Sequence, residues 1–371
     1  MKTLFVVSNM RVGGGAENIA AQTLKELHKK GHDVSLLTFY SSENEYDLGG
    51  VERFCFEKQY SSQLLLKLYR LLFLFPRKLR SFLSDNSFDV VITHAEDANV
   101  VGLLTKRKDP SMKLWTVIHN SLDNTVYKRT KGLHKHADKI ITVSEDIKQE
   151  FIETFPNKDV QKINNFLDLQ AIQPLLDKPL DTAYEKELFS KYRVLINVGR
   201  MAPQKNHELL LKTFKKLRKQ HKDIKLVILG DGPLRSSLES YVKKNGLQKD
   251  VYMPGIKNNV YRYLSRSYAF VLSSRHEGFP MVLLEAAASG LPIVSMDCPT
   301  GPKEILGNNE HGLLAKDEKE LYTHAQSLFE DRSQAEKYSR LVKQRAKQFD
   351  VKPLVAQWSD VIQSSKSRGK K

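Results

Sequence analysis

Short apolar runs alternate along the chain with segments of helical periodicity, and they do so in two blocks. The helical segment 16–31, for example, has apolar positions three or four residues apart and ends at Gly31. This alternation predicts parallel sheets covered by helices, and its restart after residue 190 predicts two sheets that face each other across a cleft. The strand candidates are 3–8, 33–39, 89–94, 114–119, 139–144, 194–199, 226–230, 251–255, 269–274 and 292–297.

The interval between the two blocks indicates a domain boundary. Pro174 and Pro179 interrupt any regular pattern over 166–190, which we interpret as a linker. We therefore expect an N-terminal domain over 1–170 and a second domain over 171–350. The remainder, 351–371, is expected to form a C-terminal helix that can return to the first domain, followed by a basic tail. Because ligands of parallel α/β sheets bind beyond the carboxyl ends of the strands, the loops there are the candidate sites.

Two glutamates in "RHEGFPMVLLEAAASG" (275–290) stand out from an apolar segment. Pro280 suits the start of a helix and Gly290 its end, so a helix is predicted over 280–289, with Glu277 before it and Glu285 inside it. The free amides at the start of such a helix bind anions. The segment thus predicts a negatively charged ligand between the two acids, with an ordinary buried helix and a capping acid as the alternative.

Two strand-to-helix loops have the composition of phosphate-binding sites. In "NMRVGGGAEN" (9–18) three consecutive glycines let the backbone approach a ligand closely. A dinucleotide fingerprint is the rival interpretation, but Asn18 stands where its third glycine belongs, and a tight turn without a ligand is another. In "NVGRMAPQKNHELLL" (197–211), Arg200 and Lys205 can hold adjacent phosphoryl groups, because one offers a planar fork and the other a compact charge.

Composition excludes several classes of protein. The chain has 371 residues, of which 40% are hydrophobic, enough for two sizeable cores. Cys55 and Cys298 cannot form a disulfide framework or a Cys-rich zinc site, and no signal peptide is evident, so we expect a cytosolic protein. Lys and Arg outnumber Asp and Glu 24 to 21 over 1–170 and 35 to 22 over 171–371. No nucleic-acid-binding signature accompanies this charge, and nucleic acid is not an expected partner.

One segment of the first block, 58–84, is both basic and apolar. It contains no acidic residue and is rich in Leu and Phe, yet it is too short and too charged to cross a bilayer. We interpret it as an amphipathic helix that lies on an anionic membrane surface, with a core helix whose basic side chains reach outward as the alternative. Its cationic residues are Lys58, Lys67, Arg70, Arg77, Lys78 and Arg80.

Taken together, four motifs resemble the retaining glycosyltransferases of family 4. They are Gly-Gly-x-Glu after the first strand, Gly-Arg-x4-Lys-Asn at 199–206, "GDGPLR" (230–235) and Glu-Gly-Phe-Pro-x4-Glu at 277–285, in the order of that family. The resemblance covers nearly the whole chain, is weakest over 40–90, and implies the GT-B architecture of two Rossmann-like domains.

The resemblance also implies roles for individual residues. Glu285 matches the acid that binds the ribose of a nucleotide sugar, and Glu277 the acid that faces the donor sugar, beside the backbone of Gly278, Phe279, Pro280 and Met281. Arg200 and Lys205 match the diphosphate-binding pair. Gly15 matches the loop glycine at the phosphates, with Glu17 in a structural role. His119 matches the active-site histidine, although a histidine after a strand is as often structural.

The function implied is transfer of a hexose or N-acetylhexosamine from a nucleotide sugar, UDP-linked by preference, with retention of configuration. The expected acceptor is a lipid-linked glycan of surface polysaccharide or lipopolysaccharide, so we expect a cytoplasmic enzyme on the inner face of the membrane. No paired aspartate motif follows a strand, which agrees with a reaction that needs no metal or other cofactor. An NAD-dependent oxidoreductase and a non-catalytic nucleotide-sugar-binding protein are the alternatives.

Overall fold

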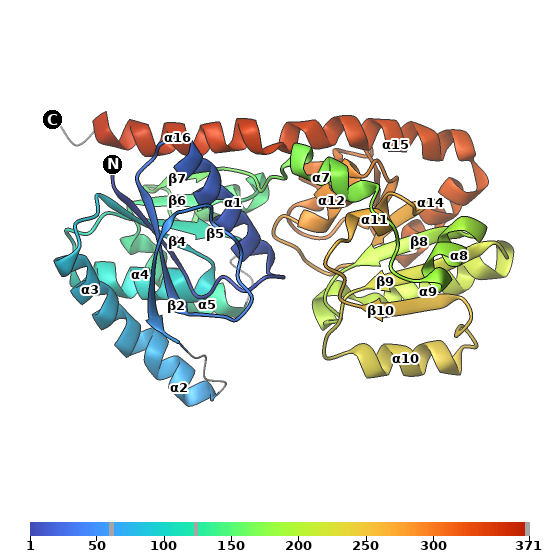
Figure 1. Cartoon of the computed structure of the whole chain (residues 1–371), viewed down its shortest axis with the longest axis horizontal. Coiled ribbons are helices and arrows are strands. Elements are labelled where there is room, and N and C mark those ends of the chain that lie inside the picture. Colours follow the sequence, from blue (N-terminus) through green and yellow to red (C-terminus); the bar gives the residue numbers. More distant parts are fainter. Residues whose placement is uncertain (59–62, 122–124, 368–371) are drawn as a thin grey trace. The chain divides into compact units, whose positions relative to one another are not determined.

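The computed structural model describes residues 1–58, 63–121 and 125–367, which form two compact units. The first unit comprises Met1–Asn165 with Lys352–Lys371, and the second comprises Phe166–Val351. In each unit, helices lie on both faces of one parallel sheet (Figure 1). The predicted α/β class with two parallel sheets is therefore confirmed.

The sheet of the first unit has the strand order β3-β2-β1-β4-β5-β6-β7. Its five inner strands are buried along their whole length, because helices cover both faces. The edge strands β3 and β7 were not predicted, since they are polar and only partly buried. The strands are β1 (Thr3–Val7), β2 (Val34–Tyr40), β3 (Glu52–Glu57), β4 (Val90–His94), β5 (Leu114–Ile118), β6 (Lys139–Thr142) and β7 (Asp159–Lys162).

The helices of the first unit include one from the far end of the chain. Trp358 of the C-terminal helix α16 is buried and its ring centroid lies 6.0 Å from that of Phe5 in β1. The last residues of the chain, 368–371, lie outside the described part. The helices are α1 (Gly15–Lys29), α2 (Leu64–Tyr69), η1 (Arg70–Leu74), α3 (Phe75–Asp85), α4 (Glu96–Lys108), α5 (Thr125–Thr130), η2 (Lys131–His136), α6 (Glu145–Thr154) and α16 (Val351–Ser367).

The sheet of the second unit has the order β10-β9-β8-β11-β12-β13. Of these strands only β13, three residues long, was not predicted. The strands are β8 (Arg193–Val198), β9 (Ile224–Leu229), β10 (Val251–Gly255), β11 (Ala269–Leu272), β12 (Ile293–Met296) and β13 (Leu313–Ala315). The helices are α7 (Leu169–Leu176), α8 (Ala183–Lys191), η3 (Pro203–Lys205), α9 (His207–Gln220), α10 (Arg235–Lys244), α11 (Tyr261–Leu264), α12 (Met281–Ala288), α13 (Pro302–Leu306), α14 (Glu318–Glu330), α15 (Arg332–Ala346) and η4 (Lys347–Phe349).

The region 166–190 is more regular than its prolines suggested. It contains α7, with Pro174 inside the helix, and the start of α8. The side chain of Asp168 accepts a hydrogen bond from the amide of Ala171 and caps α7. A capping box between Thr182 and Glu185 starts α8. The prediction of an irregular segment is therefore wrong for α7 and the start of α8, whereas Pro179 lies between the two helices, where the regular pattern is interrupted.

The segment 58–84 forms two differently buried halves, while its residues 59–62 lie outside the described part. Helix α2 and the π-helical turn η1 expose most of their apolar side chains. Helix α3 instead buries Phe75, Pro76 and Leu79, and the Phe75 ring packs 4.7 Å from that of Phe39 in β2. The prediction of one interfacial helix is therefore wrong for α3, which is a core helix.

Two glycines bring the loops of the second unit into close contact at the carboxyl ends of its strands. A Cβ atom on Gly230, after β9, would lie 2.1 Å from the carbonyl oxygen of Gly199, after β8. A Cβ atom on Gly232 would lie 2.5 Å from the carbonyl oxygen of Met201. The amide of Met201 also donates to the carbonyl of Asp231 at 2.9 Å. The motif "GDG" thus fixes the loop that carries Arg200.

Substitution of Gly230 by Ala should destabilise the second unit more than the same change at Gly246. Both glycines have positive φ, +136° and +67°, but a Cβ atom on Gly246 would have no atom within 4 Å among the described residues. We expect a loss of about 1 kcal/mol for Gly246→Ala and of at least about 2–4 kcal/mol for Gly230→Ala. Urea unfolding of both variants measures the difference, and equal losses would contradict the close packing.

Candidate active site

The centre of the candidate site is a partly buried ion pair between two loops of the second unit. Glu277 follows β11 and its side chain is 7% exposed. Its Oε1 atom accepts hydrogen bonds from Lys205 Nζ and from Ser274 Oγ, both at 2.6 Å. Lys205 ends η3, after β8, which is the neighbour of β11 in the sheet. The pair therefore joins two adjacent strand ends.

The loop after β12 supports Glu277 from its backbone side. The hydroxyl of Thr300 donates to the carbonyl oxygen of Glu277, and the amide of Glu277 donates to the carbonyl of Pro299 at 3.4 Å. Gly301 has φ +88°, and a Cβ atom there would lie 2.6 Å from Pro280 Cδ. Only glycine fits at this contact, so the segment from Glu277 to Pro280 is held in one place before helix α12 begins.

Helix α12 follows at once, and no side chain among the described residues caps its start. Pro280 occupies the N-cap, where it offers no hydrogen-bonding side chain. The amide of Leu283 donates to the carbonyl of Pro280 at 3.0 Å, so the amides of Met281 and Val282 remain available to a ligand. Glu285 lies one turn further on, is half-buried, and makes no side-chain hydrogen bond with the described residues. Burial raises the pKa of its carboxyl to about 7, and the positive charge of Lys205 partly opposes this. Helix α12 thus carries both unpaired backbone amides at its start and a carboxyl group whose pKa is raised.

Lys205 and Arg200 have different surroundings on the loop after β8. The side chain of Arg200 is exposed and forms no ion pair with the described residues, whereas Lys205 is held by Glu277. Behind them, the Nε2 atom of buried His207 lies 3.0 Å from Asn197 Oδ1, and Asn197 donates to the carbonyl of Val271 in β11 at 2.7 Å. Burial lowers the pKa of His207 to about 4. This neutral histidine fixes the start of α9.

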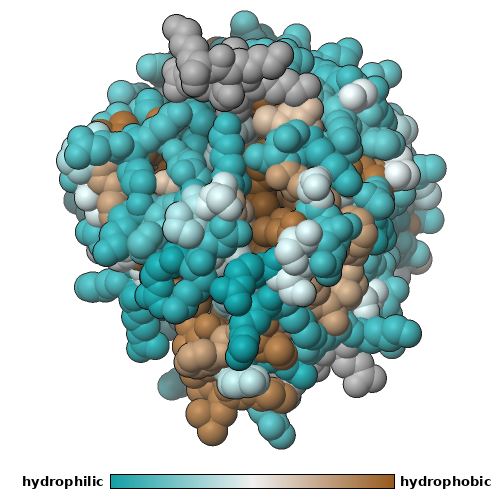
Figure 2. Space-filling model, turned by 90° about the vertical axis from the view of Figure 1, so that its left-hand side faces the viewer, coloured by the Kyte–Doolittle hydropathy of each residue, from teal (hydrophilic) through white to brown (hydrophobic). Residues whose placement is uncertain are grey.

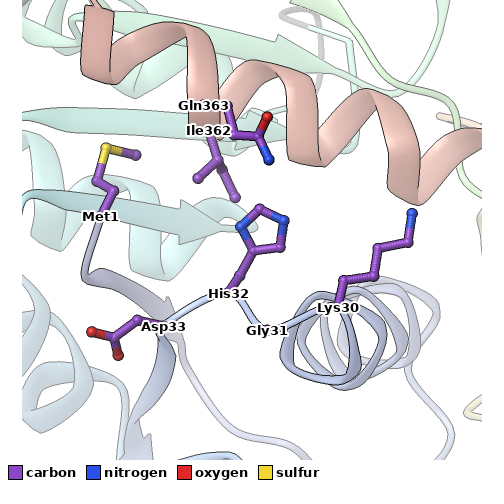
Figure 3. A pocket seen from close by; sticks show the side chains of 7 residues that line it. All are labelled: Met1, Lys30, Gly31, His32, Asp33, Ile362 and Gln363. Atoms are coloured by element: carbon purple, nitrogen blue, oxygen red, sulfur yellow. The ribbon is translucent and has the colours of Figure 1, made fainter.

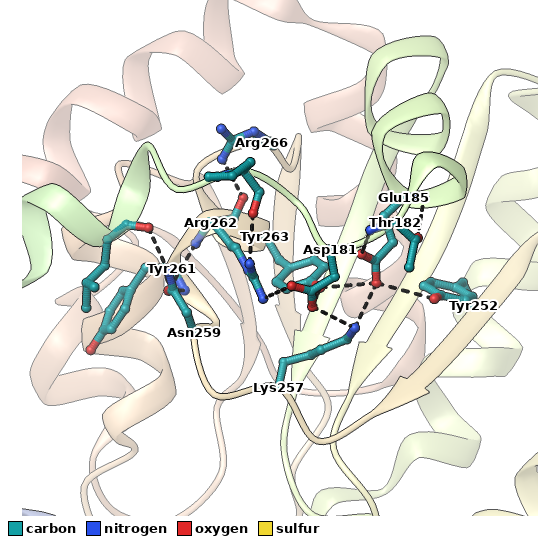
Figure 4. A network of polar contacts seen from close by, with 12 residues as sticks. Asp181, Thr182, Glu185, Tyr252, Lys257, Asn259, Tyr261, Arg262, Tyr263 and Arg266 are labelled. Atoms are coloured by element: carbon teal, nitrogen blue, oxygen red, sulfur yellow. Dashed lines mark hydrogen bonds and ion pairs between the residues drawn. The ribbon is translucent and has the colours of Figure 1, made fainter.

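The segment after β10 is fastened by a polar network (Figure 4). Lys257 forms ion pairs at 3.0 Å with Asp181 and with fully buried Glu185. Asn259 accepts from the amide of Tyr261 at 3.0 Å and thereby starts α11. Burial and the charge of Glu285 raise the pKa of the Tyr261 hydroxyl. Helix α11 contacts helix α12, and the charge of Glu285 acts on Tyr261, although the position of Tyr261 in the sequence did not reveal this.

The glycine loop of the first unit is held by its neighbours. Gly15 is the first residue of α1, and Gly14 is its N-cap. The hydroxyl of Tyr46 accepts from the amide of Gly13 at 3.0 Å and donates to the carbonyl of Gly14 at 3.3 Å. The carboxylate of Glu17 folds back over Gly14, where it would meet a Cβ atom at 1.9 Å. This contact supports the structural role expected for Glu17.

His119 follows β5 in the same unit. Its Nε2 atom is buried without a hydrogen-bond partner among the described residues, and burial lowers the pKa of the ring to about 4, so the imidazole is neutral at pH 7. The next residue, Asn120, donates to Glu96 Oε1 at 2.6 Å. His119 and Gly15 thus lie at carboxyl ends of strands in the first unit, as the sequence predicted for functional loops.

The second unit brings together four of the predicted elements, namely Lys205, Glu277, the start of α12 and Glu285. Sequence reasoning missed Ser274, Thr300 and Tyr261, which contact or approach these acids. A hydroxyl residue after each of two adjacent strands was the available signal for Ser274 and Thr300. Within the described residues, no three His, Cys, Asp or Glu side chains are grouped so as to hold a metal ion.

A cavity of about 250 Å³ in the first unit lies elsewhere (Figure 3). Its lining residues precede β1 and β2 or belong to α16, so it lies at the amino ends of the strands. The ligand-binding ends of a parallel sheet are the carboxyl ends. We therefore do not assign this cavity to the site. It is lined by Met1, Lys30, Gly31, His32, Asp33, Ile362 and Gln363.

The chain is similar to known glycosyltransferases along most of its length. The family model Glycosyltransferase Family 4 matches residues 13–171, and Glycosyl transferases group 1 matches residues 181–348. An uncharacterized glycosyltransferase of Methanocaldococcus jannaschii is 30% identical over 327 residues, which cover 75% of this chain and 80% of that protein.

Two further proteins extend this similarity. The N-acetylgalactosamine-N,N'-diacetylbacillosaminyl-diphospho-undecaprenol 4-alpha-N-acetylgalactosaminyltransferase of Campylobacter jejuni is 32% identical over 222 residues, 59% of this chain and 58% of that protein. The structure of Anabaena HepE in complex with UDP and glucose is similar with a TM-score of 0.79 at 17% identity, and covers 98% of this chain and 100% of that one. This structural likeness shows the fold.

Replacing Glu285 by Gln should stabilise the ligand-free protein at high pH but not at low pH. The pKa of about 7 in the folded state is above the reference value of 4.5. Below the reference value both states are protonated, whereas between the two values only the unfolded state ionises, so wild-type stability falls as pH rises. Above pH 7 the penalty is complete and amounts to on the order of 1–3 kcal/mol.

Thermal unfolding at pH 4.5, 6 and 8 measures this difference between wild type and Glu285→Gln. Glu330→Gln, at an exposed position of α14, controls for the loss of one charge. A Glu285→Gln effect that is the same at all three pH values would show that the carboxyl is not held in a protonated form.

Proposed function

The chain belongs to glycosyltransferase family 4, and from this membership we propose that it transfers a hexose or N-acetylhexosamine from a UDP-sugar, with retention of configuration, to a lipid-linked glycan. The acceptor would be an intermediate of surface polysaccharide or lipopolysaccharide. Membership in a family of glycosyltransferases also excludes the alternative of an NAD-dependent oxidoreductase.

The Lys205–Glu277 pair is the observation that carries this proposal. A carboxylate can accept two hydrogen bonds from the vicinal hydroxyls of a sugar, and Lys205 supplies a cation 2.6 Å from that carboxylate. A bound sugar diphosphate presents hydroxyls to the carboxylate and negative charge to the lysine, so the two groups would act side by side. Glu277 would face the donor sugar, with the backbone of Gly278, Phe279, Pro280 and Met281 beside it, and Glu285 would accept from the ribose hydroxyls.

In the proposed reaction the bond between the anomeric carbon and the diphosphate oxygen breaks. The acceptor oxygen forms its bond to that carbon on the same face, and the acceptor proton passes to the leaving diphosphate. Arg200 and Lys205 would stabilise the negative charge that grows on the leaving group, and the amides near Gly15 would contact the phosphates. The neutral imidazole of His119 would hydrogen-bond the donor sugar.

The preference for UDP and for a lipid-linked acceptor rests on relatives. HepE binds UDP in its solved complex, and the name of the Campylobacter relative describes transfer onto a diphospho-undecaprenol-linked saccharide. We further propose that the reaction needs no metal ion, because two cationic side chains can neutralise the diphosphate.

An exposed apolar patch supports the proposed membrane surface as a partner. Of the ten large apolar side chains exposed among the described residues, six lie on α2 and η1. They gather at the lower edge of the face in Figure 2. A patch of this kind on a short helix can enter the boundary of a bilayer. Its residues are Leu64, Leu65, Leu68, Tyr69, Leu72 and Phe73.

The positive charges of the segment 58–84 contribute less to the proposed membrane attraction than the sequence suggested. Arg70 and Lys78 pair with Glu57 at 3.1 Å, and Lys67 pairs with Asp97 at 3.0 Å. These two acids lie outside the segment. They pair with three of its six cations and balance two of the six positive charges. Arg77 and Arg80 remain exposed. No helix among the described residues is both long and apolar enough to cross a membrane. We therefore propose peripheral attachment to the cytoplasmic face, mainly through apolar contact.

Turnover of nucleotide sugars tests the function. UDP-hexoses and UDP-N-acetylhexosamines are assayed with a lipid-linked saccharide, with and without EDTA, and we expect activity in both conditions. Arg200→Ala should lower kcat by roughly 100-fold without loss of stability, because its side chain is exposed and acts on charge that develops in the transition state. Arg340→Ala, an exposed arginine of α15, is the matched control. Full activity of Arg200→Ala would refute its role, and strict dependence on Mn²⁺ would refute the metal-independent reaction.

Vesicle binding tests the membrane surface. Replacing Leu65, Leu68 and Leu72 by Ser should weaken binding to anionic vesicles at least about tenfold, because burial of each leucine is worth roughly 1 kcal/mol or more. The double variant Arg77→Gln, Arg80→Gln should lose only the salt-sensitive part of vesicle binding. Replacing Tyr184, Tyr192 and Ile256, exposed in the second unit, by Ser is the control. Unchanged binding of the leucine variant would exclude insertion of α2.

A further inference from the structure

A second histidine lies behind His119 in the first unit, and no motif of the sequence pointed to it. His94 is the last residue of β4 and is 0% exposed. Its ring stacks on Phe5 of β1, with centroids 5.5 Å apart, and on Trp358 of α16 at 6.0 Å. The ring of His119 lies 5.7 Å away at an angle of 38°. His94 therefore connects the C-terminal helix with the proposed active-site histidine.

The nitrogen atoms of this pair lack hydrogen-bond partners among the described residues. Neither Nδ1 nor Nε2 of His94 has one, and the same is true of Nε2 of His119. A neutral imidazole carries one N–H donor and one acceptor, and leaving them unpaired in the interior destabilises a protein. The buried His207 of the second unit differs in part, because its Nε2 atom is paired with Asn197, whereas its Nδ1 atom has no partner among the described residues. Phenylalanine would fill the stack between Phe5 and Trp358 without this cost, so packing does not account for a histidine here.

We propose that His94 is a positioning residue for the transfer reaction. Its ring nitrogen and that of His119 share one water molecule, which fixes the nitrogen of His119 that carries the proton, while the stack with Phe5 and Trp358 fixes the plane of the pair. Rings 5.7 Å apart without a direct hydrogen bond suit such a bridge. The inference rests on the proposed role of His119, and it gives α16 a part in the active site.

The test compares His94→Phe with His94→Gln in the full-length protein. His94→Phe keeps the aromatic stack but loses both nitrogens, so it should unfold at the same temperature as wild type or higher. Its kcat should fall by about 10- to 100-fold, the loss typical when the partner that orients a functional histidine is removed, with little change in KM for the donor. His94→Gln retains a donor and an acceptor and should recover part of kcat.

Nitrogen NMR of the His119 ring gives a readout that does not depend on turnover. In the ligand-free protein, His94→Phe should change the ¹⁵N shifts that report which nitrogen of His119 is protonated, even if wild type transfers none of the sugars assayed and the proposed function fails. His134→Phe is the control, because this histidine is 1% exposed and packs 5.3 Å from Phe151 in the same unit. It should leave kcat and the His119 shifts unchanged.

Three results would overturn the proposal. They are wild-type kcat in His94→Phe, His119 shifts that do not change in that variant, and a Gln variant no more active than the Phe variant. A fall in kcat that matches a loss of folded protein would assign His94 to stability alone. If His94→Phe does not fold, His94→Gln decides, because it should keep the wild-type tautomer of His119 and part of the wild-type kcat. A changed tautomer or a complete loss of kcat in the folded Gln variant would overturn the proposal.

Discussion

The ion pair between Lys205 and Glu277 is the interaction on which the arrangement of the second unit's site depends. Glu277 is buried and Lys205 is partly buried. The two residues are 72 positions apart in the sequence and join the loops after two neighbouring strands. Removing one partner of such a pair leaves a charge in the interior and is strongly unfavourable. Ser274 and Thr300 satisfy further hydrogen-bonding groups of Glu277, so the acid keeps one position before any ligand arrives.

Close backbone packing makes this pair possible. Glycines at 230, 232 and 301 let loops after four different strands approach within a distance that a Cβ atom would prevent. The result is a rigid edge of the sheet from which an exposed arginine, a paired lysine and two acids project. The carboxyl group of Glu285 has no hydrogen-bond partner among the described residues of this edge, and burial raises its pKa to about 7.

In the first unit, tertiary contacts decide which residues of a local segment are buried and which of its charges are paired. The segment 64–85 has one composition but two environments, because Phe75 and Leu79 reach the core while Leu65 and Leu68 do not. Its positive charge is partly cancelled by Glu57 and Asp97 from outside the segment. The proposed role of His94 likewise depends on tertiary contacts. Its neighbours lie on β1, after β5 and on the distant helix α16, and no motif of the sequence surrounds it.

The sequence by itself determined the two parallel sheets, ten of their strands and the family, because buried strands are nearly continuous apolar runs and the glycine and acid motifs have fixed spacing. It also identified Glu277, Glu285 and Lys205 as candidates. Only the tertiary structure decided that Glu277 is paired with Lys205 while Arg200 forms no ion pair within the described part of the chain. It alone showed that short polar runs such as 52–57 and 159–162 form edge strands, and that Tyr261 and His94 lie beside candidate residues. The reason is physical: hydrophobic periodicity is a local property, whereas ion pairs, unpaired buried groups and edge strands depend on contacts between residues far apart in the chain.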